Sequence, residues 1–106
     1  MKAVLQKNYD ILRDELGSDV SILPTIGNND VTAYNKAPCT DAEATLFYSE
    51  LYDIWFPAGS QPSGFDDTAA KATFLHGGYY SYDFPNTNIT LLAVNSVAFK
   101  VDNSCQ

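Results

Sequence analysis

The chain has 106 residues, with 13 Asp and Glu against 6 Lys and Arg, and a formal charge of -7 at pH 7. This length accommodates one domain, and the 45% hydrophobic content is typical of a chain that folds around a core. The acidic balance excludes nucleic-acid binding, which depends on clustered Lys and Arg, and no apolar run approaches the ~20 residues that cross a membrane. The first ten residues turn polar too early for the apolar core of a signal peptide.

The first third of the chain predicts a helix and then a short strand. Apolar side chains recur at helical spacing: Leu5, Tyr9, Leu12 and Leu16. We therefore expect an amphipathic helix over residues 2–16, ended by Gly17. The run at 20–23 is short, apolar and rich in β-formers, and Pro24 follows it, so it is predicted to be a strand.

The middle third predicts a loop and a second helix. Residues 25–39 have no apolar periodicity, and the segment Thr40 to Glu43 has the capping-box pattern, with Thr40 as the cap and Glu43 reaching back. The helix that opens there is expected to run to about Trp55. Its apolar face comprises Phe47, Leu51 and Ile54. Residues 57–67 are rich in Gly, Pro and Ser and are expected to form a loop.

The last third predicts a β-hairpin. In the segment 78–84, alternation places Tyr80, Tyr82 and Phe84 on one face. Residues 85–88 form the expected turn, and the chain returns over 89–96. Residues 91–94 are apolar on both faces, which predicts a strand covered on both sides. The order helix, strand, helix, hairpin is an incomplete α/β arrangement, and we expect residues 1–106 to be a single partial domain of something larger.

The two cysteines and one acceptor triplet bear on the compartment. Cys39 and Cys105 could close one long loop, worth ~4 kcal/mol in the chain-entropy model, or they could be unpaired thiols or half-bridges to other segments. With His76 as the only histidine, they do not make a zinc site by themselves. The triplet at Asn88 is an N-glycosylation acceptor, which favours a secretory or lysosomal route.

The loop at 26–30 carries the main candidate chemistry. It leaves the carboxyl end of the predicted strand, the edge at which open α/β sheets collect their ligands. Gly27 permits a sharp exit, and the amide oxygen of Asn28 is a neutral ligand for a divalent metal. A polar turn without function is the alternative, because Gly, Asn and Asp favour turns by themselves.

Two sequence blocks resemble those of a known family. The first block is Pro24-Thr25-Ile26-Gly27-Asn28-Asn29-Asp30-Val31, followed by Tyr34-Asn35. The second is Gly77-Gly78-Tyr79-Tyr80-Ser81 with Leu91-Leu92-Ala93-Val94-Asn95-Ser96. Together they resemble the calcineurin-like metallophosphoesterases, and within them the acid sphingomyelinase-like and endopolyphosphatase-like branch. Trp55 lies where such proteins often carry a tryptophan.

The resemblance implies a partial metallophosphoesterase α/β sandwich and a role for each residue of the loop. Asn28 matches a ligand to one ion of a two-metal centre (zinc, or manganese and iron). Asn29 stands where the family usually has a catalytic histidine, and its amide donates a hydrogen bond but does not titrate as a general acid. Asp30 matches the acidic residue that closes the block, where it would orient its neighbour or cap the loop. The substrate would be a phosphate ester or phosphoanhydride, such as a phosphodiester lipid headgroup or polyphosphate, in an extracellular, lysosomal or vacuolar setting.

Other blocks of the family have no counterpart in this chain. The upstream Asp-x-His and Gly-Asp-x-x-Asp blocks and the downstream histidine blocks are absent, and His76, expected at a strand start, reads as a structural or surface residue. One asparagine does not hold two ions, so the remainder of the domain is the expected partner. The alternative is a non-catalytic, truncated relative that acts as an acidic binding module through its tyrosine-rich hairpin. Asp66 and Asp67 read as exposed acids rather than a catalytic pair.

Overall fold

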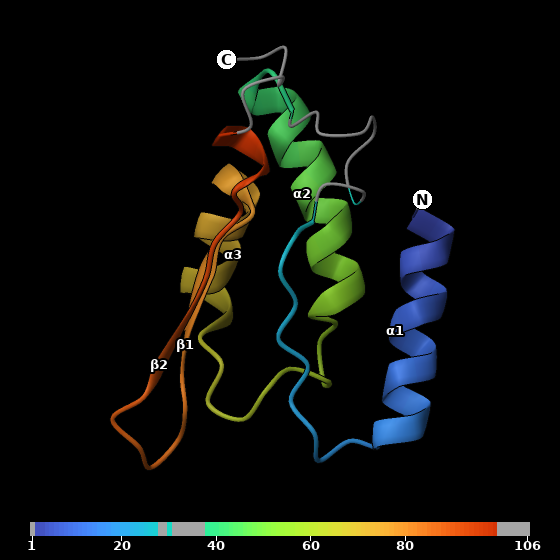
Figure 1. Ribbon diagram of the computed structural model, residues 1–106, viewed down its shortest axis with the longest axis vertical. Helices are drawn as coiled ribbons and strands as arrows, with labels where there is room; N and C mark the ends of the chain where they lie inside the picture. Colours follow the sequence, from blue (N-terminus) through green and yellow to red (C-terminus); the bar gives the residue numbers. More distant parts are fainter. Residues whose placement is uncertain (1, 28–29, 31–37, 100–106) are drawn as a thin grey trace.

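The structure is a computed structural model that describes residues 2–27, 30 and 38–99 (Figure 1). These residues form three helices and a two-stranded antiparallel sheet. The elements are α1 (Lys2–Leu16), α2 (Asp41–Trp55), α3 (Asp67–Gly77), β1 (Tyr80–Asp83), β2 (Thr90–Ala93) and a 3-10 turn at Val97–Phe99. The described part is therefore a mixed arrangement of helices and strands, compatible with a piece of an α/β fold.

The two helices expected from periodicity and capping are confirmed. α1 spans the predicted residues and buries Leu5 and Tyr9, whereas Leu12 and Leu16, expected on the same buried face, are largely exposed. α2 begins after Thr40, whose Oγ1 accepts a hydrogen bond from the Glu43 N–H at 3.2 Å. The Glu43 carboxylate reaches back as expected, although it accepts from the N–H of the residue before the cap.

The strand predicted at 20–23 is wrong. Residues 21–27 form neither helix nor strand, and the segment runs alongside α2 instead (Figure 1). Ile22 and Leu23 pack against the core, so their apolar character is used for burial without a ladder of hydrogen bonds. A strand also needs a partner strand, and the two strands in the described residues pair with each other.

A third helix occupies the segment that was expected to lead into the hairpin. Asp66 caps α3, with its Oδ1 accepting from the Ala69 N–H at 3.1 Å. Gly78 ends the helix in the left-handed conformation at φ 70°, and its N–H donates to the Phe74 carbonyl at 2.8 Å. His76 therefore lies in the last turn of a helix, where it is exposed, and not at a strand start.

Aromatic side chains from α2, α3 and β1 make up the centre of the core. Phe74 is 1% exposed, and its ring centroid lies 5.5 Å from that of Tyr52 and 6.1 Å from those of Tyr48, Phe56 and Tyr80. Most of these pairs meet edge to face, the arrangement that the ring quadrupoles favour. The three elements are thereby joined through one ring on α3.

The hairpin is confirmed, but its outer face is open. β1 and β2 pair in the register Tyr80 with Ala93 and Tyr82 with Leu91, around the predicted turn. Leu92 is 72% exposed, so the strand expected to be covered on both sides is covered on one. The apolar residues of β2 therefore do not all belong to the core of the described chain.

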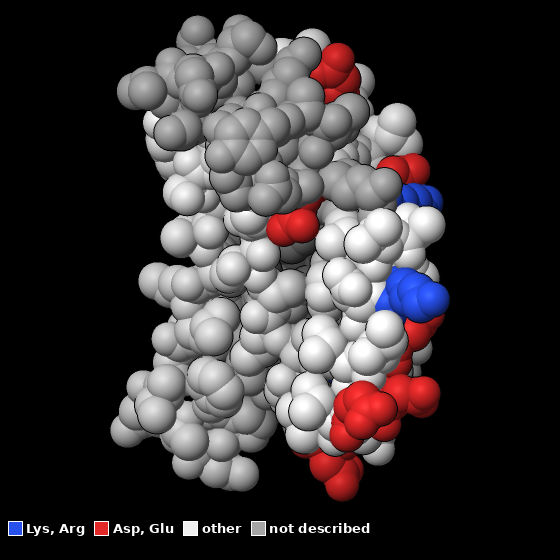
Figure 2. Space-filling view, turned by 45° about the vertical axis from the view of Figure 1, so that its right-hand side comes forward, with Lys and Arg blue, Asp and Glu red and all other residues white. Residues whose placement is uncertain are grey.

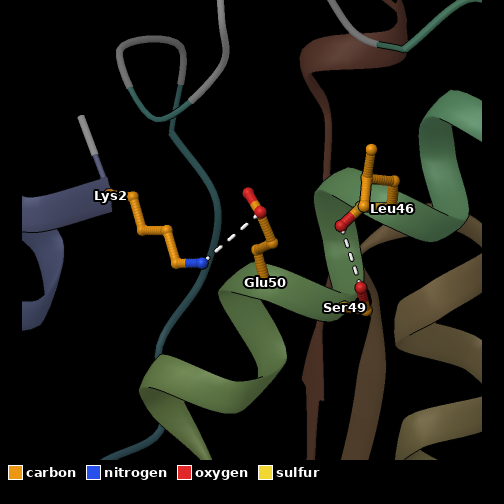
Figure 3. Close-up of polar contacts among 4 residues, drawn as sticks. All are labelled: Lys2, Leu46, Ser49 and Glu50. Atoms are coloured by element: carbon orange, nitrogen blue, oxygen red, sulfur yellow. Dashed lines mark hydrogen bonds and ion pairs between the residues drawn. The ribbon is translucent and has the colours of Figure 1, made fainter.

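α1 joins the rest of the described chain through the buried side chains Leu5 and Tyr9 and through an exposed ion pair. Lys2 Nζ lies 3.4 Å from Glu50 Oε1 of α2, near the Ser49 hydroxyl that donates to the Leu46 carbonyl (Figure 3). Both partners of this ion pair are exposed, so it contributes little to stability. The ring of Tyr9 meets that of Trp55 edge to face at 5.9 Å. In the view of Figure 2, most of the visible Asp, Glu, Lys and Arg side chains lie on the right-hand side.

No helix among the described residues is both long and apolar enough to cross a bilayer.

Candidate functional site

The candidate loop is described in part. Asn28 and Asn29, the predicted metal ligand and phosphoryl contact, lie outside the described residues. Asp30 and residues 24–27 are described, so the geometry of the loop is available on both sides of the asparagines. Their predicted roles stay predictions.

Two hydrogen bonds close the loop between Gly27 and Asp30. The Asp30 N–H donates to the Gly27 carbonyl at 3.1 Å, and the Gly27 N–H donates to Asp30 Oδ2 at 2.9 Å. A carboxylate that accepts from a backbone N–H three residues earlier stabilises a tight turn. Gly27 and Asp30 are thereby held together, and the role predicted for Asp30 in the site stays a prediction.

The inner side of the loop lies on the aromatic core. A small cavity of about 20 Å³ remains between the loop and the core. Its lining is Pro24, Thr25, Ile26 and Asp30 from the loop, with Leu51, Trp55 and Phe74 from α2 and α3. A volume of this size admits one water molecule and no phosphate group. This cavity is therefore too small to be a phosphate site.

Two contacts from the hairpin region hold the loop in place, and sequence reasoning missed both. The Tyr80 hydroxyl donates to the Pro24 carbonyl at 2.8 Å. Ile26 lies over Gly78, where an added Cβ would stand 2.5 Å from Ile26 Cδ1 and 2.9 Å from Tyr48 Cε1. The Gly-Gly-Tyr-Tyr pattern was the available signal, because a glycine with positive φ beside a buried tyrosine marks a close approach of two segments.

A buried amide strengthens the same junction. Asn95 is 7% exposed, and its Nδ2 donates to the Tyr48 hydroxyl at 3.0 Å and to the Gly77 carbonyl at 3.1 Å. Its Oδ1 accepts from the Val97 N–H at 3.2 Å, so the amide is satisfied at both ends. Burial raises the pKa of the Tyr48 hydroxyl, with the hydrogen bond from Asn95 acting in the opposite direction. The hydroxyl therefore stays protonated at neutral pH.

The other candidate side chains make hydrogen bonds within the fold or are buried in its core. Asp67 Oδ1 accepts from the Tyr52 hydroxyl at 2.6 Å and from Gln61 Nε2 at 2.7 Å, while Asp66 caps α3. The two carboxylates thus stabilise the start of α3. Tyr80 and Tyr82 are 3% and 4% exposed, which leaves no tyrosine platform on that face of the hairpin.

The structure shows the state of Cys39 and the position of Asn88. The secretory or lysosomal route predicted from them stays a prediction. Cys39 is disulfide-bonded, and Cys105 lies outside the described residues. Asn88 is exposed in the hairpin turn, two residues before Thr90, so its side chain is accessible to modification.

The described residues do not fit a metal centre by themselves. No group of three His, Cys, Asp or Glu side chains converges among them. Asp30 is the acidic side chain nearest the predicted ligand in sequence, and one of its oxygens is already engaged by the Gly27 N–H. The two metal ions implied by the resemblance would therefore need ligands from outside this set.

Comparison with known proteins gives one significant similarity. The chain is 27% identical over 85 residues to a sphingomyelinase phosphodiesterase D of Dictyostelium discoideum. The match covers 80% of this chain but 17% of the relative, so the chain spans about a sixth of the length of the protein it matches. No family model matches the chain, and no solved structure matches it. The similarity links the chain loosely to phosphodiesterases, which agrees in broad terms with the sequence blocks.

Proposed function

We propose that this chain is a segment of a metal-dependent phosphoesterase that hydrolyses a phosphodiester such as a phosphocholine lipid headgroup. The observation that supports it best is the similarity to a sphingomyelinase phosphodiesterase over 80% of the chain. The turn closed between Gly27 and Asp30 also supports it, because the backbone on both sides of the predicted ligand block is held by hydrogen bonds. The alternative substrate is polyphosphate, a phosphoanhydride that the same metal-activated water would hydrolyse.

Each residue of the loop has an assigned task in this proposal. Asn28 supplies one neutral oxygen ligand, and the remaining ligands come from the rest of a longer protein. A divalent ion in such a site supplies charge stabilisation and an activated water. Asn29 donates an amide hydrogen bond to a phosphoryl oxygen and moves no proton. Asp30 acts on the loop by holding the Gly27 N–H.

Replacement of Asn28 tests the proposal in the full-length protein from its native source. Removing a side chain in the second shell of a metal site typically costs 10–100-fold, so we expect Asn28→Ala, which removes a ligand, to lower hydrolysis at least about 100-fold. The substrate is bis(p-nitrophenyl) phosphate with zinc or manganese. Asn8→Ala, on the exposed side of α1, is the matched control and should retain the wild-type rate. Equal turnover by the two variants would refute the assignment.

We also propose an extracellular, lysosomal or vacuolar setting. The disulfide at Cys39 and the exposed acceptor at Asn88 support it, because disulfides and N-glycans both arise on the secretory route. Enzymatic removal of N-glycans should lower the mass of the native protein, and Asn88→Gln should abolish that change. An unmodified Asn88 in the native protein would count against this setting.

A non-catalytic binding module is the second candidate. Apolar side chains exposed on the outer side of the hairpin favour this candidate: Leu92 in β2 is 72% exposed and Val94, just after β2, is 67% exposed. The tyrosine face, expected to carry such binding, is buried. Absence of any phosphodiesterase activity in the native protein, with both metals supplied, would decide for this candidate.

A further inference from the structure

Two tyrosines on the buried face of β1 each bond to a different loop. The Tyr80 hydroxyl donates to the Pro24 carbonyl at 2.8 Å, and the Tyr82 hydroxyl donates to the Ser63 carbonyl at 2.6 Å. Both bonds join residues distant in the sequence, and both donors are almost fully buried. The bonds have the same chemistry and come from the same strand. They differ in the loop that they hold.

The Tyr80 bond meets the candidate loop at its base. Pro24 is followed directly by residues 25–27 and the Gly27–Asp30 turn, and it lines the small cavity beneath that turn. Burial raises the pKa of Tyr80 above its ordinary value of 10.0, so the hydroxyl remains a donor throughout the physiological range. One buried donor therefore fixes the position at which the chain enters the loop.

A second contact holds the same segment two residues further along, at Ile26. Ile26 packs against the cluster at Val97 and lies so close to Gly78 that a Cβ there would meet it at 2.5 Å. Asn95 holds the opposite side of this contact through the Tyr48 hydroxyl and the Gly77 carbonyl. Residues of the hairpin region thus converge on Pro24 and Ile26, just before Gly27.

We propose that Tyr80 is a positioning residue for the loop that Gly27 and Asp30 close, with Gly78 and Asn95 as its support, and that the loop needs this anchor for its task in hydrolysis. This inference rests on the proposed function for the task, whereas the anchoring itself rests on the contacts. Tyr82 has no part in it, because its hydroxyl bonds to Ser63 in the loop between α2 and α3. The strand therefore provides its own matched control.

The test compares Tyr80→Phe with Tyr82→Phe in the full 106-residue chain. Each variant keeps the ring and loses one hydroxyl, so the loss of global stability should be similar. Native-state amide exchange is measured at Gly27 and Asp30, whose N–H groups make the bonds that close the loop. Loss of one hydrogen bond should make both amides exchange about fivefold faster in Tyr80→Phe, and Tyr82→Phe should leave them unchanged.

Two results would overturn the inference: wild-type exchange at both amides in Tyr80→Phe, or equal acceleration in the two variants. If Tyr80→Phe does not fold, Ile26→Val provides the second variant, since it deletes the methyl over Gly78 and leaves β1 intact. It should accelerate the same two amides, and wild-type exchange there would refute the anchoring. Because no metal or substrate is present in this measurement, its outcome is independent of the hydrolysis assay.

A second readout addresses the task of the loop in the full-length, hydrolytic protein. Tyr80→Phe should lower kcat and weaken metal binding about 10-fold, the usual effect of a residue that orients a ligand, while Tyr82→Phe stays within about twofold of wild type. A merely structural role would affect the two variants equally. Equal effects would therefore remove Tyr80 from the positioning role even if Asn28→Ala behaves as proposed.

Discussion

The two faces of the hairpin differ strongly in the exposure of their side chains, although both carry large hydrophobic residues. On the inner face, Tyr80 and Tyr82 are 3% and 4% exposed and their hydroxyls bond to loop carbonyls. On the outer face, Leu92 is 72% exposed opposite Ser81. A purely apolar side chain is thus in solvent while two phenols are buried. Burial here follows from the position in the sheet, because the inner face lies against α3, and not from the hydrophobicity of the residue.

Removal of the central ring should be the most damaging change on the inner side. Phe74 is 1% exposed and contacts rings from α2 and β1, so Phe74→Ala should lower the free energy of unfolding by about 4 kcal/mol. Urea denaturation measures this change. Phe99→Ala is the control at an 80% exposed ring and should change stability by about 0.5 kcal/mol or less. Comparable losses in the two variants would show that the core does not centre on α3.

The junction of α3 and β1 should be the next most sensitive point. Gly78→Ala would place a Cβ 2.5 Å from Ile26 Cδ1 at a positive φ, so it should cost about 3 kcal/mol from strain and overpacking together. Gly17→Ala has a similar φ of 77° but meets nothing within 4 Å, so it should cost only about 1 kcal/mol. Thermal unfolding of both variants measures the difference. If Gly17→Ala is as costly as Gly78→Ala, the close approach has no energetic role.

The outer face should give the smallest effect. Leu92→Lys keeps the strand and removes an exposed apolar group, so the free energy of unfolding should change by about 0.5 kcal/mol or less. The neighbouring change Ala93→Lys, at a residue 3% exposed, places a charge against the core and should unfold much of the population. Chemical denaturation of the pair compares the two faces directly. A large loss in Leu92→Lys would mean that the outer face is covered in solution.

The sequence was sufficient for the elements whose signals are local. Helical periodicity predicts α1, and the capping-box pattern of Thr40 and Glu43 predicts the start of α2. Alternation around a four-residue turn predicts the hairpin. These signals depend on residues close together in the chain, so one sequence contains all that they need.

The errors arose where the outcome depends on distant partners or on a resemblance. The run at 20–23 has strand composition, but a ladder needs a second strand that the sequence cannot indicate. α3 was not predicted, although Asp66 and Gly78 are ordinary start and stop residues, because residues 57–67 were expected to form a loop and His76 to lie at a strand start. At the candidate site, the motif predicts a role for Asp30 that stays a prediction, whereas the contact of Tyr80 with Pro24 joins residues far apart and needed the structure.

The turn at the tip of the hairpin has an effect well beyond its own residues. Asn86 adopts a φ of 60° there, and the Phe84 N–H bonds to the Ile89 carbonyl, which sets the pairing of the two strands. A shift of that pairing by one residue would turn every side chain of β1 to the opposite face. Both tyrosine hydroxyls would then leave the carbonyls of Pro24 and Ser63 together. An insertion or deletion within this surface turn would therefore release both loops at once.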